Sequence, residues 1–140
     1  ILLLFFCFSL IKIYSQEKTD SIKSCCNNDS LLNKGEDGLE ARFPGGDPAF
    51  HRWLNKSFTS RYEMLEGSGL QGNCMVKFLI DTTGKISEMQ FCSMKGTLAE
   101  TVVREIFAKS PLWQPAVSTK RGKITQWHCQ NIIFQYGLFE

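Results

Sequence analysis

A histidine and a cysteine stand side by side near the end of the chain, at His128 and Cys129. Their residue types are those of a general base and a nucleophilic thiol. Both fall in a segment that is expected to be a strand, however, and neighbouring residues of a strand point to opposite faces of the sheet. His128 and Cys129 therefore cannot form a working catalytic dyad.

The acidic residues and the glycines offer no other catalytic pattern. Asp81, Glu88 and Glu100 are not arranged as a pair of catalytic carboxylates, and Asp81 suits a turn better. Gly45-Gly46 is not followed by the Lys-Ser or Lys-Thr of a phosphate-binding loop. The two histidines lie far apart and no Cys-x-x-Cys pair occurs, so we expect neither a metal site nor a cofactor. The sequence favours a binding protein over an enzyme.

The cysteines leave the disulfide state of the protein open. They stand at Cys7, Cys25, Cys26, Cys74, Cys92 and Cys129. Loss of Cys7 with an exported signal would leave an odd number, so that at least one thiol is unpaired or pairs between chains. Adjacent cysteines rarely bond each other, because their side chains diverge. The last three cysteines fall on expected strands and are interpreted as small buried side chains, with a Cys74–Cys129 bridge as the alternative.

The N-terminal region has the character of an export signal. The stretch from Ile1 to Ile13 is almost wholly apolar but shorter than the about 20 residues of a membrane-spanning helix. Ser15 supplies a small residue for cleavage. We therefore expect residues 1–15 to be a signal peptide that has lost its basic start, with an uncleaved membrane anchor as the alternative. Residues 16–42 are rich in Ser, Asn, Asp, Lys and Gly and are expected to be a flexible polar leader.

The remaining residues suit one folded domain, which we place at residues 43–138. Hydrophobic residues make up 43% of the chain, which is enough for a packed core. The net charge is only +2, and both signs are interspersed. A nucleic-acid-binding protein would usually carry a basic stripe, so the composition argues against a nucleic-acid partner.

The centre of this domain is an expected β-hairpin from Gly69 to Cys92. Alternate residues from 74 to 80 are apolar or a cysteine, which gives the period of two of a strand. The run Asp81–Gly84 predicts a turn, with Gly84 at positive φ. The returning run is out of phase between Ile86 and Met89, which predicts a β-bulge.

Two helices and a closing strand complete the expected fold. Asp47 and Pro48 predict an N-cap and the first turn of a helix that ends near Ser60. Thr97 and Glu100 form the capping box of a second helix. The untidy alternation of residues 124–136 fits an edge strand with a bulge. We therefore predict an α+β fold of order α-β-β-α-β, in two layers. Its three-stranded antiparallel sheet would have the order 2-1-3, with both helices on one face.

Large aromatic residues are expected in the core of this fold. Trp53, Phe78 and Trp113 carry too much apolar surface to be left exposed, so we interpret them as packing residues rather than site residues. His51 lies on the polar face of the first helix and is expected to be solvated.

Four short motifs, taken together and in this order, resemble the C-terminal domain of the TonB energy transducers. They are Phe43-Pro44-Gly45-Gly46, Gly69-Leu70-Gln71-Gly72, Val76-Lys77-Phe78-Leu79-Ile80-Asp81 with Gly84, and Leu112-Trp113-Gln114-Pro115-Ala116 before Gly122-Lys123. The resemblance runs from about Phe43 to Tyr136, and it covers nearly the whole expected domain.

This resemblance implies a periplasmic domain that acts in transmembrane transport. Such a domain binds the TonB-box segment of an outer-membrane receptor as an extra strand on the edge of its sheet, which is β-augmentation. Here the edge strand would supply the partner-binding residues, which are Gln126, His128, Gln130, Asn131, Ile132 and Ile133.

The chain also departs from the family. Members that transmit force carry a transmembrane anchor and a long spacer, and many have Tyr-Pro where this chain has Phe58-Thr59. We therefore expect a binding module of the cell envelope. One alternative is a membrane-anchored energy transducer at the inner membrane, with membrane contact only if the N-terminal segment stays uncleaved. Another is a self-associating, homodimeric or peptidoglycan-contacting accessory protein, because an edge that binds a foreign strand can also bind its own copy.

Overall fold

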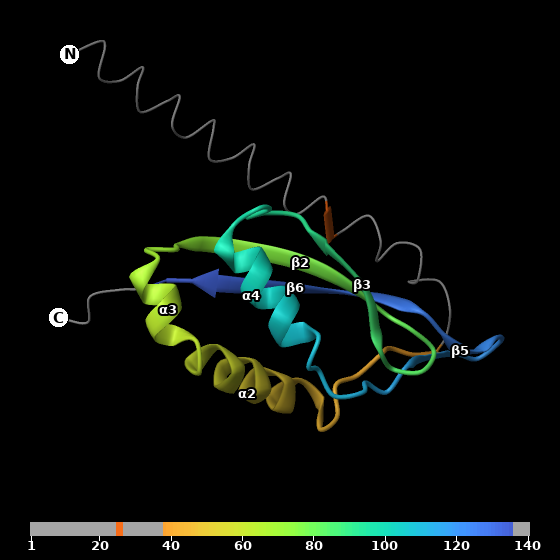
Figure 1. Ribbon diagram of the computed structural model, residues 1–140. Helices are drawn as coiled ribbons and strands as arrows, with labels where there is room; N and C mark the ends of the chain where they lie inside the picture. Colours follow the sequence, from red (N-terminus) through yellow and green to blue (C-terminus); the bar gives the residue numbers. More distant parts are fainter. Residues whose placement is uncertain (1–24, 27–37, 136–140) are drawn as a thin grey trace, which may run out of the picture.

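The computed structural model describes residues 25–26 and 38–135. Within these residues the chain forms three helices and two small three-stranded antiparallel sheets (Figure 1). The predicted α+β class is confirmed. The prediction of a single sheet with two helices is wrong, because a third helix and a second sheet are present. The expected signal peptide and most of the expected leader lie outside the described residues.

The larger sheet has the strand order β3-β2-β6. Its strands are β2 (Gly72–Ile80), β3 (Ile86–Phe91) and β6 (Gln126–Phe134). Alternation explains why β2 is central: its residues 74, 76, 78 and 80 are fully buried, and those between them are partly exposed. Both outer strands pair antiparallel to β2.

The turn between β2 and β3 has the predicted chemistry. The Asp81 carboxylate accepts the N–H groups of Thr83 at 2.8 Å and Lys85 at 3.1 Å. Gly84 has φ +86°, and its N–H donates to the Asp81 carbonyl at 3.0 Å. Just beyond, the pairing register shifts between Leu79 and Ile80, which confirms the predicted bulge.

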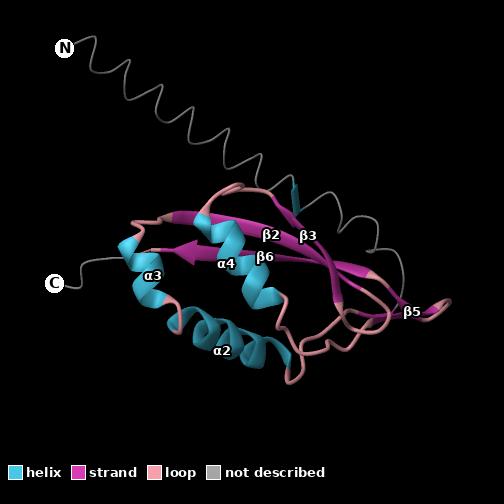
Figure 2. Ribbon diagram, viewed as in Figure 1, coloured by secondary structure: helices cyan, strands magenta, loops and turns pink. Residues whose placement is uncertain are grey.

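The helices α2 (Gly46–Thr59), α3 (Tyr62–Gly67) and α4 (Leu98–Phe107) pack on one face of this sheet (Figure 2). Their apolar residues and the buried face of β2 form one core, together with Phe43, Phe91 and Trp113. Trp113 and Phe78 are buried as predicted, and Trp53 packs against this core while partly exposed.

The predicted start of α2 is corrected, whereas the predicted N-cap of α4 is confirmed at Thr97 without its predicted hydrogen bond. α2 is capped by Gly45 at φ +85° and not by Asp47, which lies in the first turn, where a carboxylate is favourable near the helix dipole. At α4 Thr97 is the N-cap, but its hydroxyl makes no side-chain cap hydrogen bond and instead donates to the Met94 carbonyl at 2.6 Å. Glu100 does reach back, but to the N–H of Gly96 at 2.7 Å.

The second sheet has the order β1-β4-β5. It consists of β1 (Gly38–Leu39), β4 (Ala116–Ser118) and β5 (Gly122–Ile124). β1 belongs to the stretch that was expected to be a flexible leader. The predicted strand 124–136 is divided at Thr125 between β5 and β6, and β6 pairs with β2 without a register shift, so the predicted bulge in it is wrong.

Two disulfides link residues 25–26 to the larger sheet. Cys25 bonds Cys92, and Cys26 bonds Cys129, while Cys74 is a buried free thiol. The adjacent cysteines do not bond each other, as predicted. The interpretation of Cys92 and Cys129 as free thiols is wrong, and so is the alternative Cys74–Cys129 bridge. Residues 74 and 129 lie on opposite faces of the sheet, since Cys129 pairs with position 77 of β2.

The disulfides fit an extracytoplasmic domain, because such bonds persist in oxidising compartments. None of the helices in the described part of the chain is long and apolar enough to cross a membrane.

Candidate functional site

The outer edge of β6 is the feature on which the candidate site is built. β6 pairs with β2 on one side, and no described strand pairs with its other side. β3 is also an outer strand, but it has six residues against nine and carries the bulge. Short, bulged edges are poor templates for a further strand, whereas a long regular edge is a good one. β6 is therefore the edge suited to receive a partner.

The hydrogen bonds of Met75 in β2 show which backbone groups of β6 face outward. The Met75 N–H donates to Ser93 Oγ and its carbonyl accepts the Cys92 N–H, both at 2.8 Å, so position 75 faces the β3 side. In an antiparallel sheet these directions alternate along each strand. Residues 74 and 76 therefore face β6, and their partners in β6 are 132 and 130. By the same alternation, Asn131 and Ile133 turn their N–H and C=O groups to the free edge.

One side-chain hydrogen bond agrees with this assignment. Gln130 donates from Nε2 to the carbonyl oxygen of Asn131 at 2.9 Å. That carbonyl would be engaged by β2 if it pointed inward. Ile133 meanwhile exposes 63% of its surface, although it is a large apolar residue in a strand.

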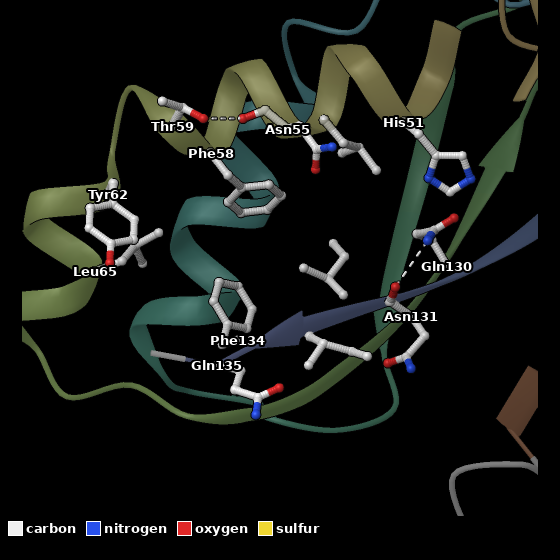
Figure 3. Close-up of a pocket in the computed structure, with 13 residues that line it drawn as sticks. His51, Asn55, Phe58, Thr59, Tyr62, Leu65, Gln130, Asn131, Phe134 and Gln135 are labelled. Atoms are coloured by element: carbon white, nitrogen blue, oxygen red, sulfur yellow. Dashed lines mark hydrogen bonds between the residues drawn. The ribbon is translucent and has the colours of Figure 1, made fainter. Parts of the chain in front are cut away.

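A groove of about 490 Å³ runs beside this edge, between β6 and the helices α2 and α3 (Figure 3). It is lined by His51, Leu54, Asn55, Phe58, Thr59, Tyr62, Leu65, Gln130, Asn131, Ile132, Ile133, Phe134 and Gln135. Its base is firmly packed, because Leu65, Ile132 and Phe134 belong to the core. The rings of Phe58 and Phe134 meet edge to face, with their centroids 5.7 Å apart.

Four of the six residues predicted to bind a partner line this groove. These are Gln130, Asn131, Ile132 and Ile133. They occupy the half of β6 nearest the C-terminus, which the groove follows. The partner-binding role of these residues stays a prediction.

Gln126 does not line the groove. Its Oε1 accepts the N–H of Ala41 at 2.7 Å, which fastens the segment after β1 to the start of β6. Its side chain therefore makes a structural contact, and its predicted partner-binding role stays a prediction.

His128 likewise does not line the groove, because its side chain packs into the core side of the sheet. Its ring lies 5.1 Å from that of Phe78 and 5.2 Å from that of Trp113, between centroids. Burial lowers the pKa of His128. The negative charges of Asp47 and Glu40 act in the other direction, but their effect is smaller. Burial therefore favours the neutral form of the imidazole, which packs against the aromatic core.

The sequence did not indicate the helical wall of the groove. His51, Asn55 and Thr59 stand four residues apart along α2 and share one face. That face was interpreted as solvated. The one feature of the sequence that could have indicated it is the composition of this face, which is polar but carries no Asp, Glu, Lys or Arg.

The described residues contain no group of three or more His, Cys, Asp or Glu side chains that could hold a metal ion. Cys129 is bonded to Cys26 and pairs with position 77 of β2, while His128 pairs with position 78. The two side chains therefore point to opposite faces.

No protein family, curated protein or solved structure matches this chain. What the site can do follows from its own geometry. Outward N–H and C=O groups at Asn131 and Ile133 can bind an extended backbone, and the groove beside them can hold every second side chain of that backbone.

Proposed function

We propose that this chain is an exported protein-binding module, not an enzyme, and that it binds an extended peptide segment by strand addition to the free edge of β6. The resemblance to the TonB C-terminal domain suggests the partner class, an envelope protein such as an outer-membrane receptor with its TonB-box segment. It also suggests the periplasm as the compartment, with which two disulfides agree.

One observation carries this proposal: the outward backbone groups of Asn131 and Ile133 lie next to a preformed groove. Outward N–H and C=O groups on an edge gain backbone hydrogen bonds when a strand is added. At Asn131 the added strand would replace Gln130 Nε2, which now donates to that carbonyl. A neighbouring groove supplies contacts for side chains, which provide selectivity. Neither feature requires a cofactor.

The resemblance can be assigned to particular elements. We take β3-β2-β6 with α2 and α4 as the counterpart of the α-β-β-α-β domain of that family. Within the second sheet, only β1 precedes the range of the resemblance. The helix α3 contributes Tyr62 and Leu65 to the groove.

Binding of labelled peptides of about ten residues, taken from TonB-box segments, tests the proposal by fluorescence anisotropy. Ile133→Pro removes an outward N–H. It should weaken binding at least about tenfold, because one backbone hydrogen bond is lost and the proline ring clashes with the added strand. Ile133→Thr keeps that N–H and should bind within about threefold of the wild type.

Circular dichroism should show that both variants keep their helices. Equal affinity of Ile133→Pro and wild type would refute strand addition at this edge. A dimer that forms without peptide and is broken by Ile133→Pro would instead assign the edge to self-association.

A further inference from the structure

The groove beside β6 is uncharged. None of its thirteen lining residues is Asp, Glu, Lys or Arg, although charged residues make up 21% of the chain. Two charged residues of α2, Arg52 and Lys56, are exposed and lie outside the lining. A charged ligand side chain that entered the groove would lose hydration without gaining an opposite charge, which is costly.

The two ends of the groove differ in polarity. His51 and Gln130 lie at one end, with Asn55 nearby, whereas Tyr62 and Leu65 lie at the other end (Figure 3). The polar end offers an imidazole and two amides, which can both donate and accept hydrogen bonds.

The apolar end is built on aromatic packing. Phe58 from α2 and Phe134 from β6 are in ring contact. Leu65 is only 2% exposed and closes this end from α3.

A strand added to β6 would place its side chains in a fixed relation to these two ends. Residues two apart on a strand lie on the same face, about 7 Å from each other. On the groove side of β6 these are Gln130, Ile132 and Phe134, since their partners in β2 belong to the buried face or its margin. A ligand residue beside Gln130 and one beside Phe134 are therefore four positions apart.

We infer that the groove selects an uncharged peptide, with a hydrogen-bonding side chain beside Gln130 and Asn55 and an aliphatic side chain four positions away beside Phe134. This inference rests on the proposed strand addition. It assigns Asn55, on a helix, as a specificity-determining residue for the side chain at the polar end.

Three ten-residue peptides of alternating sequence test this selection. The reference carries Gln and Leu four positions apart, in whichever of the two orders binds more tightly, since the strand can run in either direction. The other two replace that Gln by Glu or by Lys. The wild-type chain, with its disulfides intact, should bind the Glu and Lys peptides at least about tenfold more weakly than the reference.

The variant Asn55→Glu places one carboxylate at the polar end. It should raise the affinity for the Lys peptide and not for the Glu peptide. It should bind the Lys peptide about tenfold more tightly than the wild type does, because the ammonium gains a partner. Moving the Lys to the Leu position should abolish that gain. Lys56→Glu is the matched control. It changes the charge of α2 by more than Asn55→Glu does, but at a position outside the groove. It should therefore keep the wild-type order of peptide affinities.

The outcomes separate the inference from the proposed function. Equal binding of all three peptides by the wild type would overturn the selection and leave strand addition standing. The same would follow if Lys56→Glu matched Asn55→Glu, because the effect would then be one of general charge. Failure of every peptide to bind would refute strand addition, and the selection with it.

Discussion

Cys26 is bonded to Cys129, in the middle of β6, with their Cα atoms 5.9 Å apart and 103 positions between them in sequence. Cys129 is two residues from Asn131, whose backbone faces the free edge. The adjacent Cys25 is bonded to Cys92, just beyond the end of β3, with a Cα–Cα distance of 6.0 Å. Two neighbouring residues thus hold both outer strands of the larger sheet. This cross-link secures the candidate binding strand independently of its hydrogen bonds to β2.

Removal of the Cys26–Cys129 bond should destabilise the domain. The double variant Cys26→Ser, Cys129→Ser should lose roughly 2–4 kcal/mol of unfolding free energy, because the unfolded chain regains conformational freedom. Urea denaturation without reductant measures this loss. A reducing agent should lower the midpoint of the wild type at least as far, since it also breaks Cys25–Cys92. An unchanged midpoint in the variant would show that the bond does not form.

Gly84 should be among the least replaceable residues of the turn. It has φ +86°, and a Cβ at this position would lie 2.0 Å from the carbonyl oxygen of Trp113. The Gly84 carbonyl also accepts the Trp113 N–H at 2.8 Å, so the two backbones cannot move apart without losing that bond. We expect Gly84→Ala to cost roughly 3 kcal/mol or more, from backbone strain and from overlap.

Gly69→Ala separates these two causes. Gly69 also has a positive φ, +66°, but nothing lies within 4 Å of a Cβ placed there. Only the conformational cost should remain, about 1 kcal/mol. Thermal or urea unfolding of both variants checks the prediction, which fails if the two substitutions cost the same.

The buried His128 should make stability depend on pH. Burial lowers its pKa in the folded protein, whereas the unfolded chain titrates near about 6.5. Between these two values the unfolded chain binds more protons, so stability falls as the pH drops from about 7.5 through 6.5 toward the lower folded value. One such group contributes a slope of at most about 1.4 kcal/mol per pH unit.

The variant His128→Phe keeps an aromatic ring beside Phe78 and cannot be protonated. The difference in unfolding free energy between pH 7.5 and pH 5.5 should therefore be smaller in this variant than in the wild type. His51→Gln, on the exposed surface of α2, serves as the control and should keep the wild-type difference. A pH dependence in His128→Phe that equals or exceeds that of the wild type would contradict the assignment.

Local patterns allowed much of the fold to be predicted. The alternation in β2, the Asp81–Gly84 turn and the bulge beyond it all depend on residues close in sequence, and each was confirmed. The edge position of β6 followed from its mixed polarity. The division of the predicted strand 124–136 at Thr125 did not follow, because β5 pairs with β4 in the second sheet whereas β6 pairs with β2.

Features that join distant residues could not be predicted. The bonds of Cys25 to Cys92 and of Cys26 to Cys129 join residues 67 and 103 positions apart, and no spacing in the sequence encodes these pairings. The groove depends on α2 lying beside β6, so Asn55 and Phe58 had no visible relation to Gln130. His128 was predicted to bind a partner because the sequence indicated its strand. The sequence did not indicate that its ring packs against Phe50 and Trp113.

Amide hydrogen exchange at β6 tests the central claim most directly. In the free protein the N–H groups of Asn131 and Ile133 should exchange rapidly, whereas those of Gln130 and Ile132 should be protected by β2. Saturation with a binding peptide should slow exchange at Asn131 and Ile133 at least about tenfold and leave the other two nearly unchanged. Binding that protects neither Asn131 nor Ile133 would contradict strand addition to β6.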